Sequence, residues 1–187
     1  MACRQGTTGD TIRRAVHAER LTQLPARTQN SGHSRQLATL RGLSEKCSYI
    51  RGRAGETFPF EDHSFDFIFD IMAASTFMVG NGLRERYSRE IKRLLKPGGV
   101  LFIFTGRSDG EYQKKLDISR RGVEDGTFYR SMDGTLEKGY TRSEIINLCS
   151  PLKPAVLESQ SRYFRAFGHQ ELVRPEGFWF AVFMNEE

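Results

Sequence analysis

The chain contains few cysteines and histidines and no long apolar segment. Its 187 residues include three cysteines and four histidines. The cysteines form no CxxC pair and no metal-ligand spacing with the histidines, so neither a disulfide framework nor a metal site is expected. Sparse cysteines of this kind are typical of reduced thiols and predict a cytoplasmic protein. No apolar run approaches the ~20 residues that a membrane-spanning helix needs, so no membrane partner is expected.

Basic residues are concentrated at the start of the chain. Eight of the 28 Lys and Arg, but only three of the 23 Asp and Glu, lie in residues 1–50, so the remainder is neutral. Such a segment could be an organelle transit peptide, a nucleic-acid-binding arm or the solvated face of a helix. Its basic residues are not interleaved with aromatic ones, as binding of a single strand would require. This favours the solvated helix, and nucleic acid is not expected as a partner.

The clearest pattern lies between residues 58 and 105. A nearly continuous apolar and aromatic run at 65–72 predicts a strand that is covered on both faces, as in a parallel sheet. Residues 83–95 place their apolar side chains on one helical stripe, and a Pro-Gly-Gly turn at 97–99 ends that helix. A second apolar strand follows at 100–104. Together these segments predict a right-handed βαβ unit with parallel strands.

Weaker signals flank this unit. The preceding segment predicts, in order, a helix at 11–20, a strand at 21–24, a helix at 34–43 and a strand at 47–50. The polar, glycine-rich connection at 106–140 is typical of a functional loop or lid, with a short helix at 112–118. A capping box between Thr141 and Glu144 predicts the start of the next helix. Strands beginning at 155 and spanning 177–184 then predict an antiparallel hairpin at a sheet edge.

Two motifs in the central unit carry a family resemblance. Phe-Pro-Phe at 58–60 with Ser-Phe-Asp at 64–66, followed by Leu-Leu-Lys-Pro-Gly-Gly at 94–99, resembles class I S-adenosylmethionine-dependent methyltransferases of the type 11-like group. The resemblance implies a Rossmann-like, doubly wound α/β sheet of strand order 3-2-1-4-5-7-6. That sheet is mostly parallel, with an antiparallel C-terminal hairpin.

The resemblance also implies how the chain is organised. It implies one methyltransferase-like domain over residues 1–187, and four parts follow in order along it. They are an incomplete cofactor-binding half (1–57), the core from strand four to strand five (58–105), a substrate or lid region (106–140), and a C-terminal helix with the edge hairpin (141–187).

The half expected to bind S-adenosylmethionine departs from the family pattern. The family's glycine turn aligns with residues 2–6, where Gly6 keeps the last glycine and Arg4 replaces the middle one. Pro25 stands where the family has a carboxylate for the ribose hydroxyls. Arg53 replaces the acid that contacts the adenine amino group, although Ala54 could still offer its backbone N–H.

Strand one would precede the first residue. We therefore expect it to be missing, the edge of strand four to be unpaired, and the chain to be a fragment or to carry a wrong start site.

Ligands are expected beyond the carboxyl ends of the strands, near the topological switch point. In this chain that edge corresponds to residues 70–75 and 106–139. Asp70 and Ile71, at the exit of strand four, join Gly6, Arg53 and Ala54 as candidate cofactor-binding residues. Asp70 could equally be a solvated strand-end acid. No catalytic residue is assigned, because methyl transfer depends mainly on holding donor and acceptor in line.

The sequence leaves three functions to distinguish. The resemblance implies a methyltransferase that transfers a methyl group from S-adenosylmethionine to a small-molecule acceptor. The alternative is a catalytically inactive methyltransferase-like module that acts through protein contacts, which Arg4, Pro25 and Arg53 favour. A dinucleotide-dependent oxidoreductase is disfavoured, because no intact Gly-x-Gly-x-x-Gly with a following acid is present.

Overall fold

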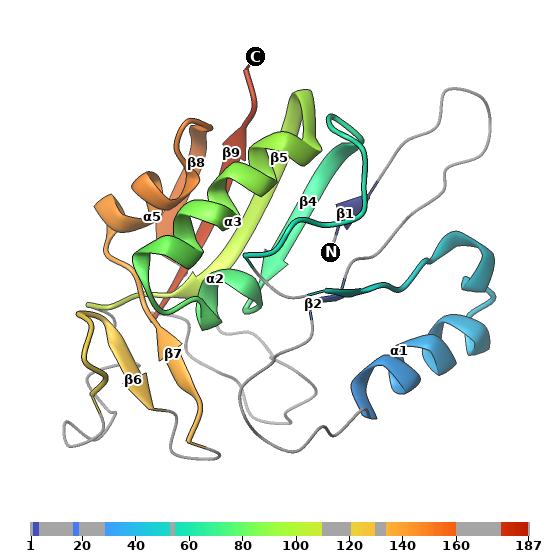
Figure 1. Cartoon of the computed structure of the whole chain (residues 1–187), viewed down its shortest axis with the longest axis horizontal. Helices are drawn as coiled ribbons and strands as arrows, with labels where there is room; N and C mark the ends of the chain where they lie inside the picture. The colour runs from blue at the N-terminus through green and yellow to red at the C-terminus, as the bar shows by residue number, and fades with distance from the viewer. Residues whose placement is uncertain are drawn as a thin grey trace.

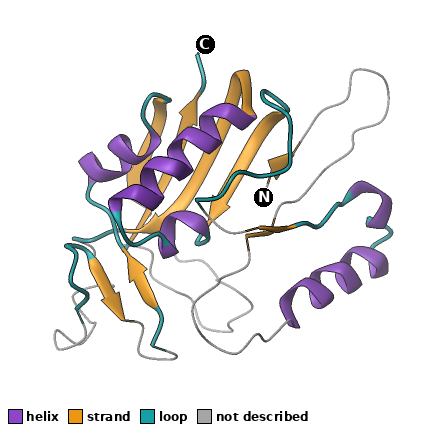
Figure 2. Ribbon diagram, in the orientation of Figure 1, coloured by secondary structure: helices purple, strands orange, loops and turns teal. Residues whose placement is uncertain are grey.

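The structure is a computed structural model (Figures 1 and 2) that describes residues 2–3, 17–18, 29–52, 55–109, 121–129, 134–159 and 177–186. Its central sheet contains, in spatial order, β1 (Ala2–Cys3), β4 (Phe65–Ile71), β5 (Leu95–Gly106), β9 (Phe178–Met184) and β8 (Lys153–Ser159). The helices that follow β4 and precede β8 are α2 (Ala74–Phe77), α3 (Asn81–Leu94) and α5 (Arg142–Cys149). Helices α3 and α5 lie side by side on one face of this sheet (Figure 1).

The predicted βαβ unit is confirmed. β4 and β5 pair in parallel, with Ile68 opposite Leu101, and α2 and α3 connect them. β9 is antiparallel to both of its neighbours, β5 and β8. The order β4-β5-β9-β8 therefore reproduces the 4-5-7-6 half of the expected sheet, with its antiparallel C-terminal hairpin.

The edge of β4 differs from the expectation. Ala2 and Cys3, which were expected to form a glycine turn, instead pair antiparallel with β4, Ala2 opposite Ile68. The edge of β4 is thus paired with another strand at two of its residues, Phe67 and Ile68. Within the described residues no parallel strand flanks β4 on this side.

The segment before β4 also needs correction. β2 (His17–Ala18) and β3 (Arg51–Gly52) form a separate parallel pair, so the helix predicted at 11–20 is wrong at His17 and Ala18. The strand predicted at 47–50 is irregular there and lies at β3 instead. The helix predicted at 34–43 is confirmed as α1 (Gln29–Leu40), which begins earlier and precedes the 3-10 turn η1 (Ser44–Lys46). The predictions for 21–24 and 112–118 fall outside the described residues.

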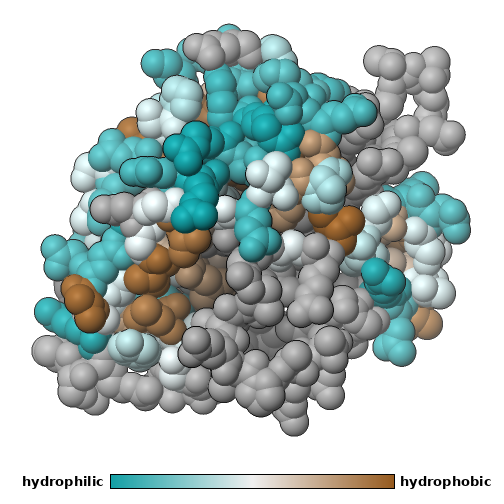
Figure 3. Space-filling view, in the orientation of Figure 1, coloured by the Kyte–Doolittle hydropathy of each residue, from teal (hydrophilic) through white to brown (hydrophobic). Residues whose placement is uncertain are grey.

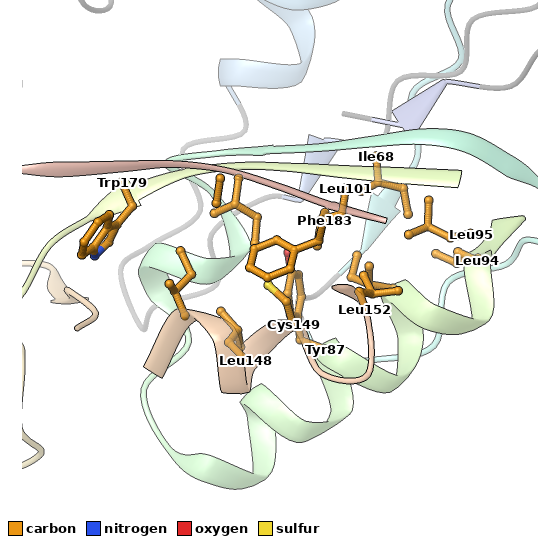
Figure 4. Close-up of a cluster of buried hydrophobic side chains, with 14 of the residues drawn as sticks. Ile68, Tyr87, Leu94, Leu95, Leu101, Leu148, Cys149, Leu152, Trp179 and Phe183 are labelled. Atoms are coloured by element: carbon orange, nitrogen blue, oxygen red, sulfur yellow. The ribbon is translucent and has the colours of Figure 1, made fainter. Parts of the chain in front are cut away.

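The hydrophobic core lies between the sheet and the two helices α3 and α5 (Figure 4). Leucine, tyrosine and isoleucine side chains at every fourth position give α3 one apolar stripe, and that stripe faces the sheet. Alternate residues of β5 and β9 complete the core from the other side. The buried members labelled in Figure 4 are Ile68, Tyr87, Leu94, Leu95, Leu101, Leu148, Cys149, Leu152, Trp179 and Phe183.

The other face of the sheet is aromatic and half-buried. The Phe69 and Phe102 rings stack with centroids 4.6 Å apart, and Phe104 stacks on Phe178 at 5.1 Å. Such pairs stabilise the sheet by about 0.5–1.5 kcal/mol each beyond their area burial. Phe67 of β4 lies on the same face, is half-buried and also contacts the Phe102 ring.

Arg93 explains why the two family motifs occur together. Its guanidinium donates to the backbone oxygens of Phe58 (3.1 Å) and Phe60 (2.8 Å) and to the carboxylates of Asp62 and Glu90, both at 2.6 Å. Glu90 in turn accepts the N–H of Phe58 at 2.8 Å. The last turn of α3 therefore holds the chain that leads into β4.

A second polar anchor fixes the Pro-Gly-Gly turn. Gly98 has a φ of +76°, which glycine adopts without strain, and its N–H donates to the Asn185 backbone oxygen at 2.6 Å. The buried Asn185 carboxamide donates to the carbonyls of Leu95 and Lys96. The turn was predicted as the break between helix and strand, but β5 begins before it, at Leu95. Chain that follows β9 thus fastens the start of β5.

Candidate functional site at the carboxyl ends of β4 and β5

Asp70, the penultimate residue of β4, is 4% exposed. One of its carboxylate oxygens accepts the Tyr87 hydroxyl of α3 at 2.7 Å, and the other accepts the N–H of Ala73 at 3.2 Å. Burial, and next to it the Asp70 charge, raise the pKa of Tyr87 well above its ordinary value, so that the hydroxyl stays a donor. Asp70 is therefore not a solvated strand-end acid. It ties the end of β4 to α3.

The next two residues form the open part of this edge. Ile71 is 53% exposed although it ends a strand of the central sheet. Met72 has a φ of +47°, and its N–H donates to the carbonyl of Phe104 at 2.8 Å. A non-glycine residue in this conformation costs of order 1–3 kcal/mol, and such residues cluster at functional sites. Ile71 and Met72 therefore form an exposed, conformationally strained exit of β4.

The exit of β5 is built around Arg107. Its guanidinium lies 4.5 Å from the Trp179 ring and donates to both carboxylate oxygens of Asp109, at 2.9 and 3.0 Å. The indole N–H of Trp179 donates to the Tyr140 carbonyl at 2.7 Å. Tyr140 also accepts the N–H of Ser108 and donates its own to Gly106. These contacts continue the end of β5 into the 106–140 region.

The hairpin-like pair of β6 (Thr127–Tyr129) and β7 (Leu136–Lys138) comes from this region and is antiparallel. Glu124, just before β6, accepts the backbone N–H of Gly80 at 3.0 Å and forms an ion pair with Arg84 of α3. The hydrogen bond from Arg84 lowers the pKa of Glu124, against the opposing effect of burial, and the Gly80 N–H lowers it further. The region predicted as a lid is thus fastened to the start of α3 by a carboxylate.

Two buried threonines lie between these exits. The hydroxyls of Thr76, on α2, and Thr105, near the end of β5, are 3.3 Å apart, and both residues are fully buried. Residues of β7 also lie close to α2, and Glu137 of β7 is buried as well. The interior of this edge is therefore polar although it is closed to solvent.

The structure places the predicted site residues unevenly. Asp70 and Ile71 lie next to each other at the exit of β4, where Asp70 is buried and Ile71 is exposed. Gly6, Arg53 and Ala54 lie outside the described residues. The residue before Arg53, Gly52, is packed so closely that a Cβ on it would lie 2.6 Å from the Phe58 ring. This contact brings β3 against the motif that precedes β4.

Sequence reasoning missed Glu124, Arg84, Thr76 and Thr105. Glu124 and Arg84 stand 40 positions apart, and no local pattern pairs them. Tyr140 is buried, whereas Tyr129 is 39% exposed. Trp179, which stands between two phenylalanines of β9, is buried in the core.

No helix in the described part of the chain is long and apolar enough to cross a membrane. Within the same residues, no group of three or more His, Cys, Asp and Glu side chains is arranged to hold a metal ion.

Comparison with known sequences gives one family. The sequence profile of a family described as a methyltransferase domain matches residues 2–103, more than half of the chain. A search of curated protein sequences returned no match.

Solved structures share the fold at low sequence identity. An S-adenosylmethionine-dependent methyltransferase from Methanosarcina mazei is 17% identical with a TM-score of 0.68, covering 92% of this chain and 81% of that one. A protein from Pyrococcus horikoshii is 14% identical with a TM-score of 0.63, covering 92% and 71%. The 1,6-didemethyltoxoflavin-N1-methyltransferase of Burkholderia thailandensis, which contains that substrate and S-adenosylhomocysteine, is 15% identical with a TM-score of 0.53, covering 81% and 56%.

Proposed function

Because the chain belongs to the methyltransferase-domain family of class I, whose cofactor is S-adenosylmethionine, we propose that it transfers a methyl group to a small-molecule acceptor. The observation that carries the proposal is the construction of one sheet edge. The exposed exit of β4 at Ile71 and Met72 stands beside an exit of β5 that continues into the β6–β7 region. This edge is where ligands of open α/β sheets bind.

The residues at the exit of β4 fit the cofactor in part. Ile71 offers an exposed apolar side chain and Met72 a fixed backbone bend, so these two residues would hold the methionine end of the cofactor. Asp70 would act through Tyr87, by fixing the direction in which β4 ends. When bound, S-adenosylmethionine supplies an electrophilic methyl group on its sulfonium. Gly6, Arg53 and Ala54 remain proposed contacts from the family pattern.

Support for a small acceptor comes from the 106–140 region. Glu124 fastens β6 and β7 to the start of α3, and Tyr140 fastens them to the end of β5, so the region has two anchors. A segment anchored in this way can exclude water from the carboxyl edge while donor and acceptor are aligned. The B. thailandensis neighbour, which binds a small heterocyclic substrate, shares this fold.

The sparse cysteines support a cytoplasmic location for this activity. Family membership gives no support to the catalytically inactive alternative, which rests on the replacements Arg4, Pro25 and Arg53.

Cofactor binding by the full chain tests the proposal. We expect equilibrium dialysis with labelled S-adenosylmethionine to show saturable binding, and Ile71→Lys to weaken it at least tenfold, because a cation would lie beside the sulfonium. Met184→Lys is the matched control, since Met184 is an exposed apolar residue at the opposite end of the same sheet. A folded chain that binds no cofactor would refute the enzyme assignment.

Arg53→Asp tests the fit of the adenine end. This change restores the acceptor that the family places there, so we expect cofactor affinity to rise about fivefold, the value of one ordinary hydrogen bond. Arg41→Asp makes the same charge change at an exposed residue and should leave affinity unchanged. Unchanged binding by Arg53→Asp would show that this position does not contact the adenine.

A further inference from the structure

A hollow of about 440 Å³ lies on the helical side of the sheet, between α3, β7 and α5. This volume falls in the range of small-molecule sites, roughly 300–1,000 Å³. Its charged lining comprises Arg84, Glu85, Arg89, Lys138 and Glu144. Asn147, Ser88 and Ser150 add neutral polar groups, and Tyr140 and Leu148 contribute buried aromatic and apolar surface. The outward side of α3 is largely hydrophilic, and hydrophobic atoms gather below and to the left of it in the view of Figure 3. None of the expected cofactor-binding residues lines this hollow.

Two of the cations in the hollow already have partners. Arg84 pairs with Glu124, and Lys138, which is 2% exposed, pairs with Glu144 at 2.9 Å. The Lys138 ammonium also donates to the Asp125 carbonyl at 2.6 Å. The charges of Arg84 and Lys138 are therefore neutralised by their partners, and these two ion pairs form part of the lining of the hollow.

Two opposite charges remain available on α3. Glu85 and Arg89 stand at the i,i+4 spacing at which such side chains pair, yet in the described part of the chain neither forms an ion pair or a side-chain hydrogen bond. Across the hollow, the Asn147 carboxamide on α5 likewise has no hydrogen bond among the described residues. One cavity is thus bordered by a cation that can bind an anion (Arg89), an anion that can bind a cation (Glu85) and an amide (Asn147).

We propose that this hollow binds a small zwitterion of the amino-acid class. Its carboxylate would meet Arg89 and Asn147, and its ammonium would meet Glu85. The side chain of the ligand would lie against Leu148 and Tyr140. A simple anion or cation would gain only one of the two charged contacts, because the lining as a whole is close to neutral. A zwitterion gains both.

The site is independent of the proposed methyl transfer, because it shares no proposed cofactor contact with the carboxyl edge. It is connected to that edge all the same. Arg84 lines the hollow and holds Glu124, and Tyr140 lines it and pairs with the end of β5. A bound ligand would therefore contact the same residues that anchor the 106–140 region.

A titration of the full chain with L-methionine, followed by amide NMR shifts, tests the proposal. We expect saturable shifts at residues of α3 and α5 around Arg89 and Asn147. Acetate and methylammonium, which carry one charge each, should bind at least about fivefold more weakly. The same titration is repeated with S-adenosylmethionine, which carries the same amino-acid group. A site that recognises that group alone would bind both L-methionine and S-adenosylmethionine.

Three variants locate the contacts. Arg89→Gln and Glu85→Gln should each weaken L-methionine binding at least about fivefold. Arg86→Gln is the matched control, since Arg86 is an exposed residue of the same helix outside the hollow, and it should have no effect. Absence of shifts at α3 and α5, shifts confined to Ile71 and Met72, or equal affinity in all three variants would overturn the proposal. So would acetate binding as tightly as L-methionine.

Discussion

Replacing Arg93 by alanine should destabilise the chain strongly. Its guanidinium makes five hydrogen bonds, three to the carboxylates of Glu90 and Asp62 and two to backbone oxygens of the segment before β4. Its side chain is 25% exposed, and that of Glu90 is 9% exposed. The hydrogen bonding that Arg93 donates to Glu90 is the main cause that raises the pKa of Arg93, so the guanidinium is always charged.

The size of the effect follows from these contacts. Breaking a fully buried ion pair costs about 3–5 kcal/mol, because the remaining charge loses its partner. Solvent reaches Asp62 and part of Arg93, which reduces this cost. We expect Arg93→Ala to lower the free energy of unfolding by about 3 kcal/mol. With a urea dependence of about 2 kcal/mol per molar, the midpoint of urea unfolding should fall by about 1.5 M.

Two comparisons separate the loss of the Arg93 contacts from a general effect on α3. Arg86→Ala removes an exposed arginine that donates only within its own helix, so its effect should stay within about 0.5 kcal/mol. The double variant Arg93→Gln with Glu90→Gln should cost at least about 1 kcal/mol less than the sum of its two single variants, because it leaves no buried carboxylate unpaired; only the exposed Asp62 loses its partner. Additive costs, or an Arg93→Ala chain within about 1 kcal/mol of the parent, would refute the reasoning.

Three further predictions concern single contacts. The pKa of Glu124 lies below its ordinary 4.5 in the folded chain, so its stabilisation is complete above that value and is lost as pH falls through the lower folded pKa. The drop in melting temperature between about pH 5 and pH 3 should therefore be smaller in Glu124→Gln, and an identical drop would exclude the pair with Arg84. Tyr87→Phe removes a donor from buried Asp70 and should cost about 1–3 kcal/mol in urea unfolding, whereas a cost near zero would contradict that bond. Thr141→Ala should cost about 1 kcal/mol and Thr141→Ser much less, and equal melting temperatures would argue against the capping box.

Local patterns were enough for the core of the fold. The stripe of α3 and the continuous apolar runs of β4 and β5 are set by side chains within a few positions of one another, so their elements were predicted correctly. The capping box at Thr141 was predicted from two residues three positions apart, and both of its hydrogen bonds are present. The place of β9 between β5 and β8 is not a local property, and only the family resemblance implied it.

The errors have the same physical origin. A strand of two residues, such as β1 or β3, is defined by its partner rather than by its own periodicity, and so its position was missed. The burial of Asp70 depends on Tyr87, which lies one helix away and carries no motif. Glu124 looks like an ordinary acid before a glycine turn. Its role depends on Gly80 and Arg84, which are distant in sequence.

The position of β9 inside the sheet bears on how the chain is made. β5 is a central strand, yet its second neighbour, β9, and the Asn185 anchor are synthesised well after it, and Asn185 stands 90 positions after the Leu95 carbonyl that it holds. At about 5–20 residues per second, a ribosome needs roughly 5–18 s to cover that interval. During this time β5 presents an unpaired, apolar edge to the surrounding solution. Newly made chains should therefore depend on protection of that edge, such as a chaperone, until β9 has left the ribosome and can pair with β5.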